Sequence, residues 1–500
     1  METSPDLPWL SLSIWTPILV GVLLLALRSA GAGAVRATAL LGSVVSALLT
    51  VPIVTGFDAA AHGLQMVERV SWIARPNAHY YLGVDGLSLW FIPLTAFTTV
   101  IAVLAGWKAI EDRIAQYYGA FLILSGLMIG VFCAADGLLF YVFFEATLIP
   151  MYLIIGVWGG PRRVYAAIKF FLYTLLGSLL MLVALVYLYQ ASGGNFDIAA
   201  WQRLPIGLVP QIFLFLAFFA AFAVKVPMWP VHTWLPDAHV EAPTAGSVVL
   251  AAIMLKLGAY GFVRFSLPIA PDAAHELAPA VIFLSLVAVV YIGFVALVQT
   301  DMKKLVAYSS IAHMGFVTLG FFIFSPIGVE GALAQMISHG FVSGAMFLCI
   351  GVMYDRTHSR AIADYGGVVN TMPRFATFMM LFAMANCGLP ATSGFVGEFL
   401  VILGAVQYDL WIGAIAATTL VLGAAYSLWM YKRVIFGAVG NATIAGLKDI
   451  DAREAIALGL LAAAVLWMGL YPAPVIHAMH SSVTDLLAQA SHVKILAGNP

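Results

Sequence analysis

Two lysines lie inside long apolar stretches of this 500-residue chain. Lys225 and Lys256 belong to residues 221–260, which read AFAVKVPMWPVHTWLPDAHVEAPTAGSVVLAAIMLKLGAY. A lysine near the centre of a bilayer costs roughly 2.5–3.5 kcal/mol on insertion scales, so it is rare there without a function. Because an ammonium group can bind and release a proton, we predict that both lysines relay protons.

Further ionisable residues stand in similar apolar surroundings. The full set of candidate proton-carrying residues is Glu145, Lys225, Lys256, His313, His339 and Glu398. Glu145 and Lys225 are predicted to lie on helices of the same orientation, so they can form an ion pair that lowers the penalty of burying both charges. Moving such a partner would change the affinity of the lysine for its proton.

A packing function is the alternative for each of these residues. A buried ion pair also fixes how helices pack, and a lone histidine on an apolar helix is often a hydrogen-bonded core residue. An inert scaffold, whose buried charges only specify packing, is therefore a competing hypothesis. The cluster of His232, Asp237, His239 and Glu241 is either a proton entry funnel or a solvated loop.

Proline and glycine interrupt the stretches that carry Lys225 and Glu398. The residues concerned are Pro227, Pro230, Pro390, Gly388, Gly394 and Gly397. Unwound backbone is tolerated at membrane depth only where protein or water satisfies its polar groups. We therefore predict hydrated pockets at the two breaks, with a simple packing kink as the alternative.

The composition indicates which elements position these residues. Hydrophobic residues make up 62% of the chain and charged residues 9%, whereas soluble domains contain about 25% charged residues. The fold class predicted is an all-α membrane protein with lipid as its main solvent. The net charge of −1 gives no indication of nucleic acid binding, and the sequence contains no metal-ligand spacing or catalytic triad.

About fourteen transmembrane helices are predicted, and helices 7 and 12 are predicted to be broken. Their ranges are 10–28, 34–55, 81–105, 116–134, 137–157, 163–190, 211–235, 242–265, 279–299, 303–324, 330–354, 374–406, 410–433 and 454–472. Residues 56–80 are predicted to be a polar connection, and residues 473–500 a short, mildly polar tail. Most lysines and arginines fall in the odd-to-even connections, so the positive-inside rule places both termini outside the cytoplasm.

Helices four to eight and nine to thirteen follow the same plan. Each set has a long fourth helix interrupted by proline and glycine, at KVPMWP and at CGLPATSGFVGE. Five helices is an odd number, so the second set must insert upside down, and such inverted five-helix repeats indicate a transport site within the bilayer. The predicted divisions are 1–115, 116–270, 271–436 and 437–500.

Several motifs resemble a known family. FFEATLIPMYLIIGVWGG (143–160), the 221–260 stretch, DMKKLVAYSSIAHMGF (301–316), QMISHGFVSGAMFL (335–348) and GLPATSGFVGEF (388–399) resemble the antiporter-like membrane subunits of respiratory complex I. These subunits are also similar to cation/proton antiporters. The glutamate in the second broken helix resembles that of the M-type subunits, the chain-4 type of mitochondria.

This resemblance implies proton translocation within an NADH–quinone oxidoreductase. Glu145 would modulate Lys225, and Lys256, His313 and His339 would form a central axis that ends at Glu398. The chain itself would hold no cofactor, since NADH, FMN, iron–sulfur clusters and quinone are expected in partner subunits, with L- and N-type subunits as neighbours. The expected location is a bacterial plasma membrane, multi-pass, with periplasmic termini. A multisubunit Na⁺/proton antiporter is the alternative.

Overall fold

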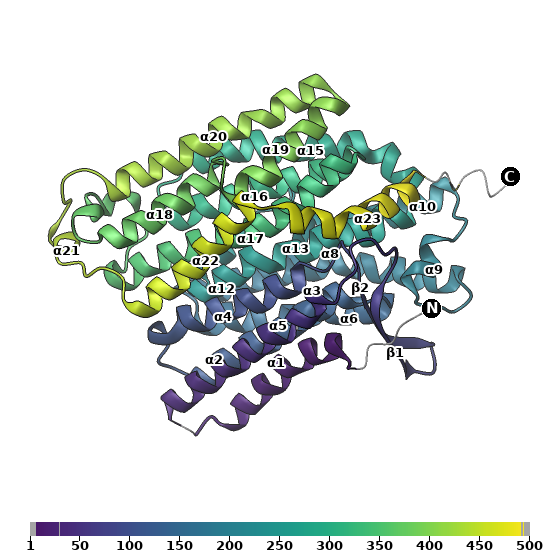
Figure 1. Ribbon diagram of the computed structural model, residues 1–500, viewed down its shortest axis with the longest axis horizontal. Coiled ribbons are helices and arrows are strands. Elements are labelled where there is room, and N and C mark those ends of the chain that lie inside the picture. The colour runs from purple at the N-terminus through teal and green to yellow at the C-terminus, as the bar shows by residue number, and fades with distance from the viewer. Residues whose placement is uncertain (1–6, 30, 492–493, 495–500) are drawn as a thin grey trace.

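The computed structural model describes residues 7–29, 31–491 and 494 as a bundle of long helices (Figure 1). Thirteen helical segments in this part of the chain are long and apolar enough to cross a membrane. They are α1 (Trp9–Ala26), α2–α3 (Ala32–Thr55), α4 (Phe91–Ala109), α5 (Ile114–Cys133), α6–α7 (Gly137–Trp158), α8 (Arg163–Ala191), α10 (Leu208–Lys225), α12–α14 (Thr244–Ile269), α15 (Pro271–Leu297), α16 (Met302–Phe322), α17 (Pro326–Thr357), α20 (Leu410–Ile435) and α22 (Ala452–Leu470). The all-α membrane fold is confirmed.

The two predicted helix breaks lie at the proline-containing positions. Helix α10 ends at Lys225, and the chain resumes as α11 (Trp234–Glu241) after a non-helical segment. The predicted twelfth span consists of α18 (Pro373–Asn386) and α19 (Ser393–Tyr408), separated by residues 387–392. Proline lacks the amide hydrogen that an uninterrupted helix needs, which accounts for both interruptions.

The third predicted span, 81–105, is wrong at its start. Residues Ala78–Val84 form strand β2, which pairs antiparallel with β1 (Gln65–Ile73) inside the predicted polar connection. Aromatic and β-branched residues favour strands, and β2 carries Tyr80 and Tyr81. The helix begins only at α4, because the Asp85 carboxylate accepts a hydrogen bond from the Leu87 amide and forms a turn after the strand.

The predicted polar tail is also wrong, because residues Ala473–Ala490 form helix α23. Val475, Met479, Val483 and Leu486 recur at helical spacing and are buried. This apolar face packs against α17 and α14. Polar residues lie between these positions, so the mean hydropathy of the segment is low and does not reveal its apolar face.

Acidic side chains define where several helices begin. The carboxylates of Asp136, Asp301 and Asp409 accept hydrogen bonds from the first free amides of α6, α16 and α20. Asp451 and Glu454 form a reciprocal capping box at the start of α22. These caps set where each helix enters the bundle.

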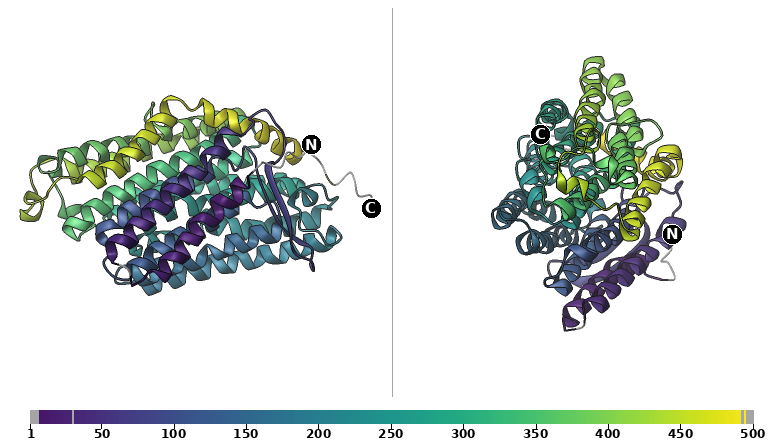
Figure 2. Two further views of the ribbon diagram at one scale, coloured as in Figure 1. Left: turned by 60° about the horizontal axis from the view of Figure 1, so that its bottom comes forward. Right: turned by 90° about the vertical axis from the view of Figure 1, so that its left-hand side faces the viewer.

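The most deeply buried segments are α12–α14, α16 and α17. In the end-on view of Figure 2 the purple N-terminal helices lie at one edge of the bundle and the green helices near residue 400 at the other. Leu172, Leu176 and Val183 of α8 are exposed, as expected for a face that meets lipid. The central segments therefore provide the part of the bundle that is shielded from lipid.

The two ends of the bundle differ. The β-hairpin, α9 (Ile198–Gln202) and α23 lie at one end, called here the hairpin side, and α21 (Ala442–Ala445) lies at the other (Figure 1). The Leu10 amide donates to Glu68 of β1, and the Lys494 amide donates to Asp272 at the start of α15. The start of α1 and Lys494 therefore both lie on the hairpin side.

Candidate functional site

Lys256 lies in the centre of the bundle on a helix with two irregular turns. Helix α13 (Leu255–Gly261) is flanked by the π-helical turns Leu250–Met254 and Phe262–Ser266. The Lys256 ammonium nitrogen donates to the Ala251 carbonyl at 2.5 Å and lies 2.6 Å from Nδ1 of His339. A π-helical turn changes the normal carbonyl pairing, which leaves the Ala251 oxygen available to a side chain.

Two more residues extend this contact across the second half of the bundle. The rings of His339 and His313 are 5.7 Å apart between centroids. Nε2 of His313 lies 3.8 Å from Oε1 of Glu398 and 3.3 Å from the Tyr426 hydroxyl. We call Lys256, His339, His313 and Glu398 the polar axis; each comes from a different helix, and each is at most 3% exposed.

The break between α18 and α19 makes room for the Glu398 carboxylate. Gly388 has a φ of +74°, and a Cβ there would lie 2.5 Å from Oε2 of Glu398. The Gln335 side chain donates to Oε1 of Glu398 at 3.4 Å. Glycine is therefore required at position 388 both for its backbone conformation and for the space that the carboxylate occupies.

Gly397 sets the distance between α17 and α19. A Cβ at this position would lie 2.6 Å from the backbone nitrogen and Cα of Gln335. We expect Gly397→Ala to push the helices apart and to lower the stability of the protein by about 1–3 kcal/mol. Thermal unfolding in detergent measures this, with Gly459→Ala as the control because a Cβ at position 459 would have no neighbouring atom within 4 Å. Equal unfolding temperatures for the two variants would contradict the prediction.

Glu145 and Lys225 do not form the direct ion pair that was predicted. The Lys225 ammonium donates to the Phe144 carbonyl at 3.2 Å and to the Thr147 hydroxyl at 3.3 Å, and lies 3.8 Å from the centre of the Phe144 ring. Oε1 of Glu145 is buried without a hydrogen-bond partner. The two groups still interact electrostatically, so the carboxylate is a neighbour of the lysine rather than its bonded partner.

The break after α10 is closed by protein groups. The Trp234 indole donates to the Val224 carbonyl at 2.8 Å, which satisfies an acceptor at the interrupted end of the helix. A cavity of about 540 Å³ borders the break, and its lining, which includes Trp229, Pro230 and Val231, is almost entirely apolar. The prediction of a hydrated pocket is therefore wrong for this side of the Lys225 break.

Asp237, His239 and Glu241 of the predicted cluster lie on helix α11, whereas His232 is buried in the non-helical segment before it, so the cluster is not one solvated loop. Asp237 binds Lys169 at 2.7 Å, and Glu241 accepts a hydrogen bond from the Arg162 amide. His239 is fully buried on α11, and its ring stacks on Phe347 with 4.3 Å between centroids. Because α11 is helical, these neighbouring residues point in different directions and find different partners.

Lys303 is a candidate functional residue that the sequence analysis did not assign, and His239, named there only in a possible entry funnel, is a second candidate. The Lys303 ammonium is buried and donates to the Ala242 carbonyl at 2.6 Å. The charges of Lys303 and Lys256 are both close enough to act on His239. The sequence contained a signal for the burial of His239. It follows Leu235 by four residues, so the two side chains share one face of the helix, and Leu235 is buried.

Buried polar atoms without a hydrogen-bond partner gather around the polar axis. They include both ring nitrogens of His239, Nε2 of His339 and Oε1 of Gln335. Most buried polar groups in proteins are paired, so each exception requires an explanation.

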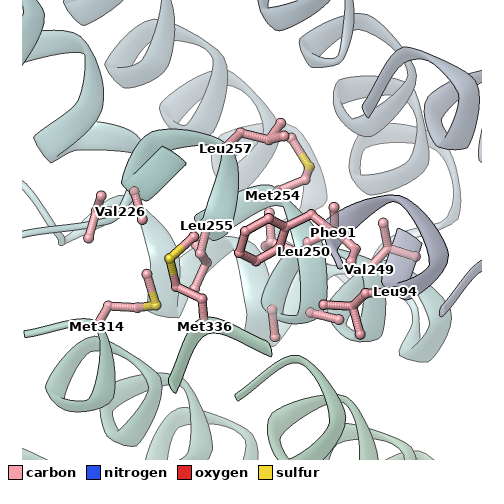
Figure 3. Packing of buried hydrophobic residues seen from close by; sticks show 14 of the residues in the cluster. Phe91, Leu94, Val226, Val249, Leu250, Met254, Leu255, Leu257, Met314 and Met336 are labelled. Atoms are coloured by element: carbon pink, nitrogen blue, oxygen red, sulfur yellow. The ribbon is translucent and has the colours of Figure 1, made fainter. Parts of the chain in front are cut away.

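Apolar side chains enclose the polar axis. Leu255 precedes Lys256 and lies beside Met336 and Met314 of the neighbouring helices (Figure 3). A low local dielectric strengthens each electrostatic interaction among the buried charges. Within the described residues no group of three or more His, Cys, Asp or Glu side chains is arranged to hold a metal ion. Amine, imidazole and carboxyl side chains such as those of the polar axis can each bind and release a proton.

Comparisons with known proteins identify similar chains. Residues 134–423 match the family model described as NADH:quinone oxidoreductase/Mrp antiporter, TM. The NADH-quinone oxidoreductase subunit M of Rhodobacter capsulatus is 53% identical, with 90% of each chain covered. The NADH-ubiquinone oxidoreductase chain 4 of Arabidopsis thaliana is 46% identical over 95% of this chain and 96% of its own. A chain in the structure of respiratory complex I from Thermus thermophilus with bound NADH superposes with a TM-score of 0.87 at 32% identity, covering 96% of this chain and 99% of that one.

Proposed function

Because the chain belongs to the NADH:quinone oxidoreductase/Mrp antiporter membrane family, as an M-type subunit, we propose that it translocates protons along the polar axis. Its activity is that of a membrane subunit of a proton-translocating NADH:quinone oxidoreductase. The observation that carries the proposed route is the 2.6 Å contact between Lys256 and His339, followed by His313 and Glu398.

The proton route has an entry and an exit. Lys303 and His239 pass protons to Lys256, and the Lys256 ammonium donates to Nδ1 of His339. A neutral imidazole accepts a proton at one nitrogen and releases it from the other, so His339 and His313 conduct in sequence. Glu398 accepts the proton last, and bridging water spans the separations too long for a direct hydrogen bond.

Glu145 regulates Lys225 in this proposal. The unpartnered Oε1 of Glu145 attracts the Lys225 ammonium, which is held by the weaker acceptors Phe144 and Thr147. A shift of Lys225 toward Glu145 changes the field at Lys256, because Gly258 of α13 packs against Lys225: a Cβ there would lie 3.0 Å from that of the lysine. Residues 116–270 and 271–436 form the two inverted repeats that supply the two broken helices.

The remaining parts of the enzyme lie in partner subunits. NADH, FMN, iron–sulfur clusters and quinone bind there, and the L- and N-type antiporter-like subunits are the neighbours of this chain. The protein is a multi-pass membrane protein, and we place it in a bacterial plasma membrane with the hairpin side and both termini facing the periplasm. Co-purification with flavin and iron–sulfur subunits would exclude the alternative, a stand-alone Na⁺/proton antiporter.

Replacing His339 tests the proposed route. In the assembled complex we expect His339→Phe to reduce NADH-driven proton uptake into liposomes by at least about tenfold, because phenylalanine cannot accept the proton of Lys256. A pH-sensitive dye measures uptake, and the assembled complex is quantified in the same preparation. His275→Phe is the matched control, since His275 stacks on Phe324 away from the polar axis. Wild-type pumping by assembled His339→Phe would overturn the route.

A further inference from the structure

A second cavity opens on the hairpin side, away from the polar axis (Figure 1). It has a volume of about 590 Å³, far more than the roughly 10–15 Å³ that one water molecule needs. Exposed residues at its rim include Gly63, Arg203 and Gln489. Charged groups of both signs line it, so the cavity suits water rather than an apolar ligand.

An ion pair closes the floor of this cavity. The Arg264 guanidinium donates to Oδ1 of Asp85 at 2.7 Å and to the Tyr260 hydroxyl at 2.9 Å. The Tyr260 hydroxyl in turn donates to the Phe132 carbonyl at 3.1 Å. The side chains of Arg264 and Asp85 are only 12% and 10% exposed, so this cluster separates the cavity from the interior.

The floor of the cavity lies close to Lys256 along one helical element. Lys256, Tyr260 and Arg264 follow one another at intervals of four residues, and four residues rise about 6 Å along a helix. The hydrogen bond between Arg264 and Tyr260 shows that these two share a face. The tyrosine therefore lies between the ion pair and the helical turn that carries the central lysine.

We propose that the Arg264–Asp85 pair is an electrostatic gate that keeps protons in the outer cavity from reaching Lys256. A guanidinium stays charged at all physiological pH values, so it cannot relay a proton, and its charge repels hydronium. Asp85 holds the guanidinium across the path. This inference rests on the proposed function, since a gate matters only if Lys256 carries protons that must leave by Glu398.

If the Arg264–Asp85 pair is a gate, replacing Arg264 should make the complex leaky to protons. With Arg264→Gln we expect passive proton flux across liposomes with the reconstituted complex to rise at least about tenfold, which corresponds to about 1.4 kcal/mol of lost repulsion. The flux is measured after an imposed pH step without NADH. Arg203→Gln is the matched control, because Arg203 lines the exposed rim of the same cavity, and its flux should equal that of the wild type.

Two double variants test the mechanism and the route. Exchanging the charges, with Arg264→Asp and Asp85→Arg together, should restore a low flux. Adding Lys256→Met to Arg264→Gln should also remove the leak, because the lysine is the next proton acceptor inside. A leak that persists in that second double variant would overturn the route through Lys256.

A single result would refute the gate itself. If Arg264→Gln assembles and remains as proton-tight as the wild type, the ion pair is only structural. Asp85→Asn provides the same test should Arg264→Gln not assemble: a raised flux supports the gate, and a wild-type flux overturns it. Because the assay needs no turnover, its outcome is separate from that of His339→Phe, which tests the proposed function.

Discussion

Replacing Lys256 by methionine is expected to reduce NADH-coupled proton translocation by about 100-fold or more, the scale on which a required proton-transfer group contributes. Lys256 is fully buried, and its ammonium contacts His339 directly. Methionine retains most of the length of the side chain but cannot carry a proton. NADH–quinone turnover should fall with pumping if the two are coupled.

Assembly of the Lys256→Met complex is expected to be normal. Burying an ammonium is unfavourable, and an apolar replacement of similar shape removes that penalty. The Nδ1 atom of His339 loses its partner at a cost of about 1–3 kcal/mol, which partly offsets this gain. Lys304→Met is the matched control, because Lys304 is exposed at the start of α16, and it should pump normally.

The scaffold hypothesis makes the opposite prediction for this variant. If the buried lysine only specified packing, Lys256→Met would alter stability or assembly and leave the pumping of each assembled complex unchanged. Proton uptake per assembled complex, measured beside thermal unfolding, separates the two. Full pumping by an assembled variant would refute the proton-carrying role of Lys256.

Glu398→Gln is expected to have the second-largest effect, a loss of at least about tenfold in proton translocation with near-normal stability. The carboxylate lies 3.8 Å from Nε2 of His313 and accepts from Gln335. Glutamine has the same shape and keeps an oxygen acceptor, so the break between α18 and α19 can remain packed. It cannot take up the proton that His313 delivers.

Controls identify the charge as the cause of this effect. Glu276→Gln changes an exposed carboxylate on α15 and should leave pumping unchanged. Glu398→Asp keeps the carboxylate but draws it away from His313, so we expect intermediate pumping. Equal pumping by Glu398→Gln and the wild type, measured with a pH dye in liposomes, would remove Glu398 from the route.

Much of the membrane topology was predictable because each span is determined by a local run of apolar residues. The prolines near residues 225 and 390 correctly indicated breaks in two helices. The β-hairpin and α23 were not predicted. The hairpin is marked only by strand-like alternation of side chains, and α23 only by apolar residues spaced about four apart within a polar stretch. Average hydropathy does not detect either pattern.

The candidate residues could be named from the sequence, but most of their partners could not. A charged residue within an apolar run is unfavourable whichever helices the run packs against. Lys225, Lys256 and Glu398 can therefore be recognised as candidates without any knowledge of their contacts. Their neighbours depend on which helix faces meet. Lys225 contacts Phe144 and Thr147 rather than Glu145, a difference that only side-chain geometry decides.

The sequence alone determined that the protein crosses a membrane, where its helices break and which buried residues can hold protons, because these properties depend on local hydrophobicity and charge. The tertiary structure alone decided that Lys256 meets His339, that the buried Lys303 donates to the Ala242 carbonyl, and that Asp85 and Arg264 pair beside an outer cavity. These contacts join residues distant in sequence, and they follow from how whole helix faces pack rather than from any short pattern.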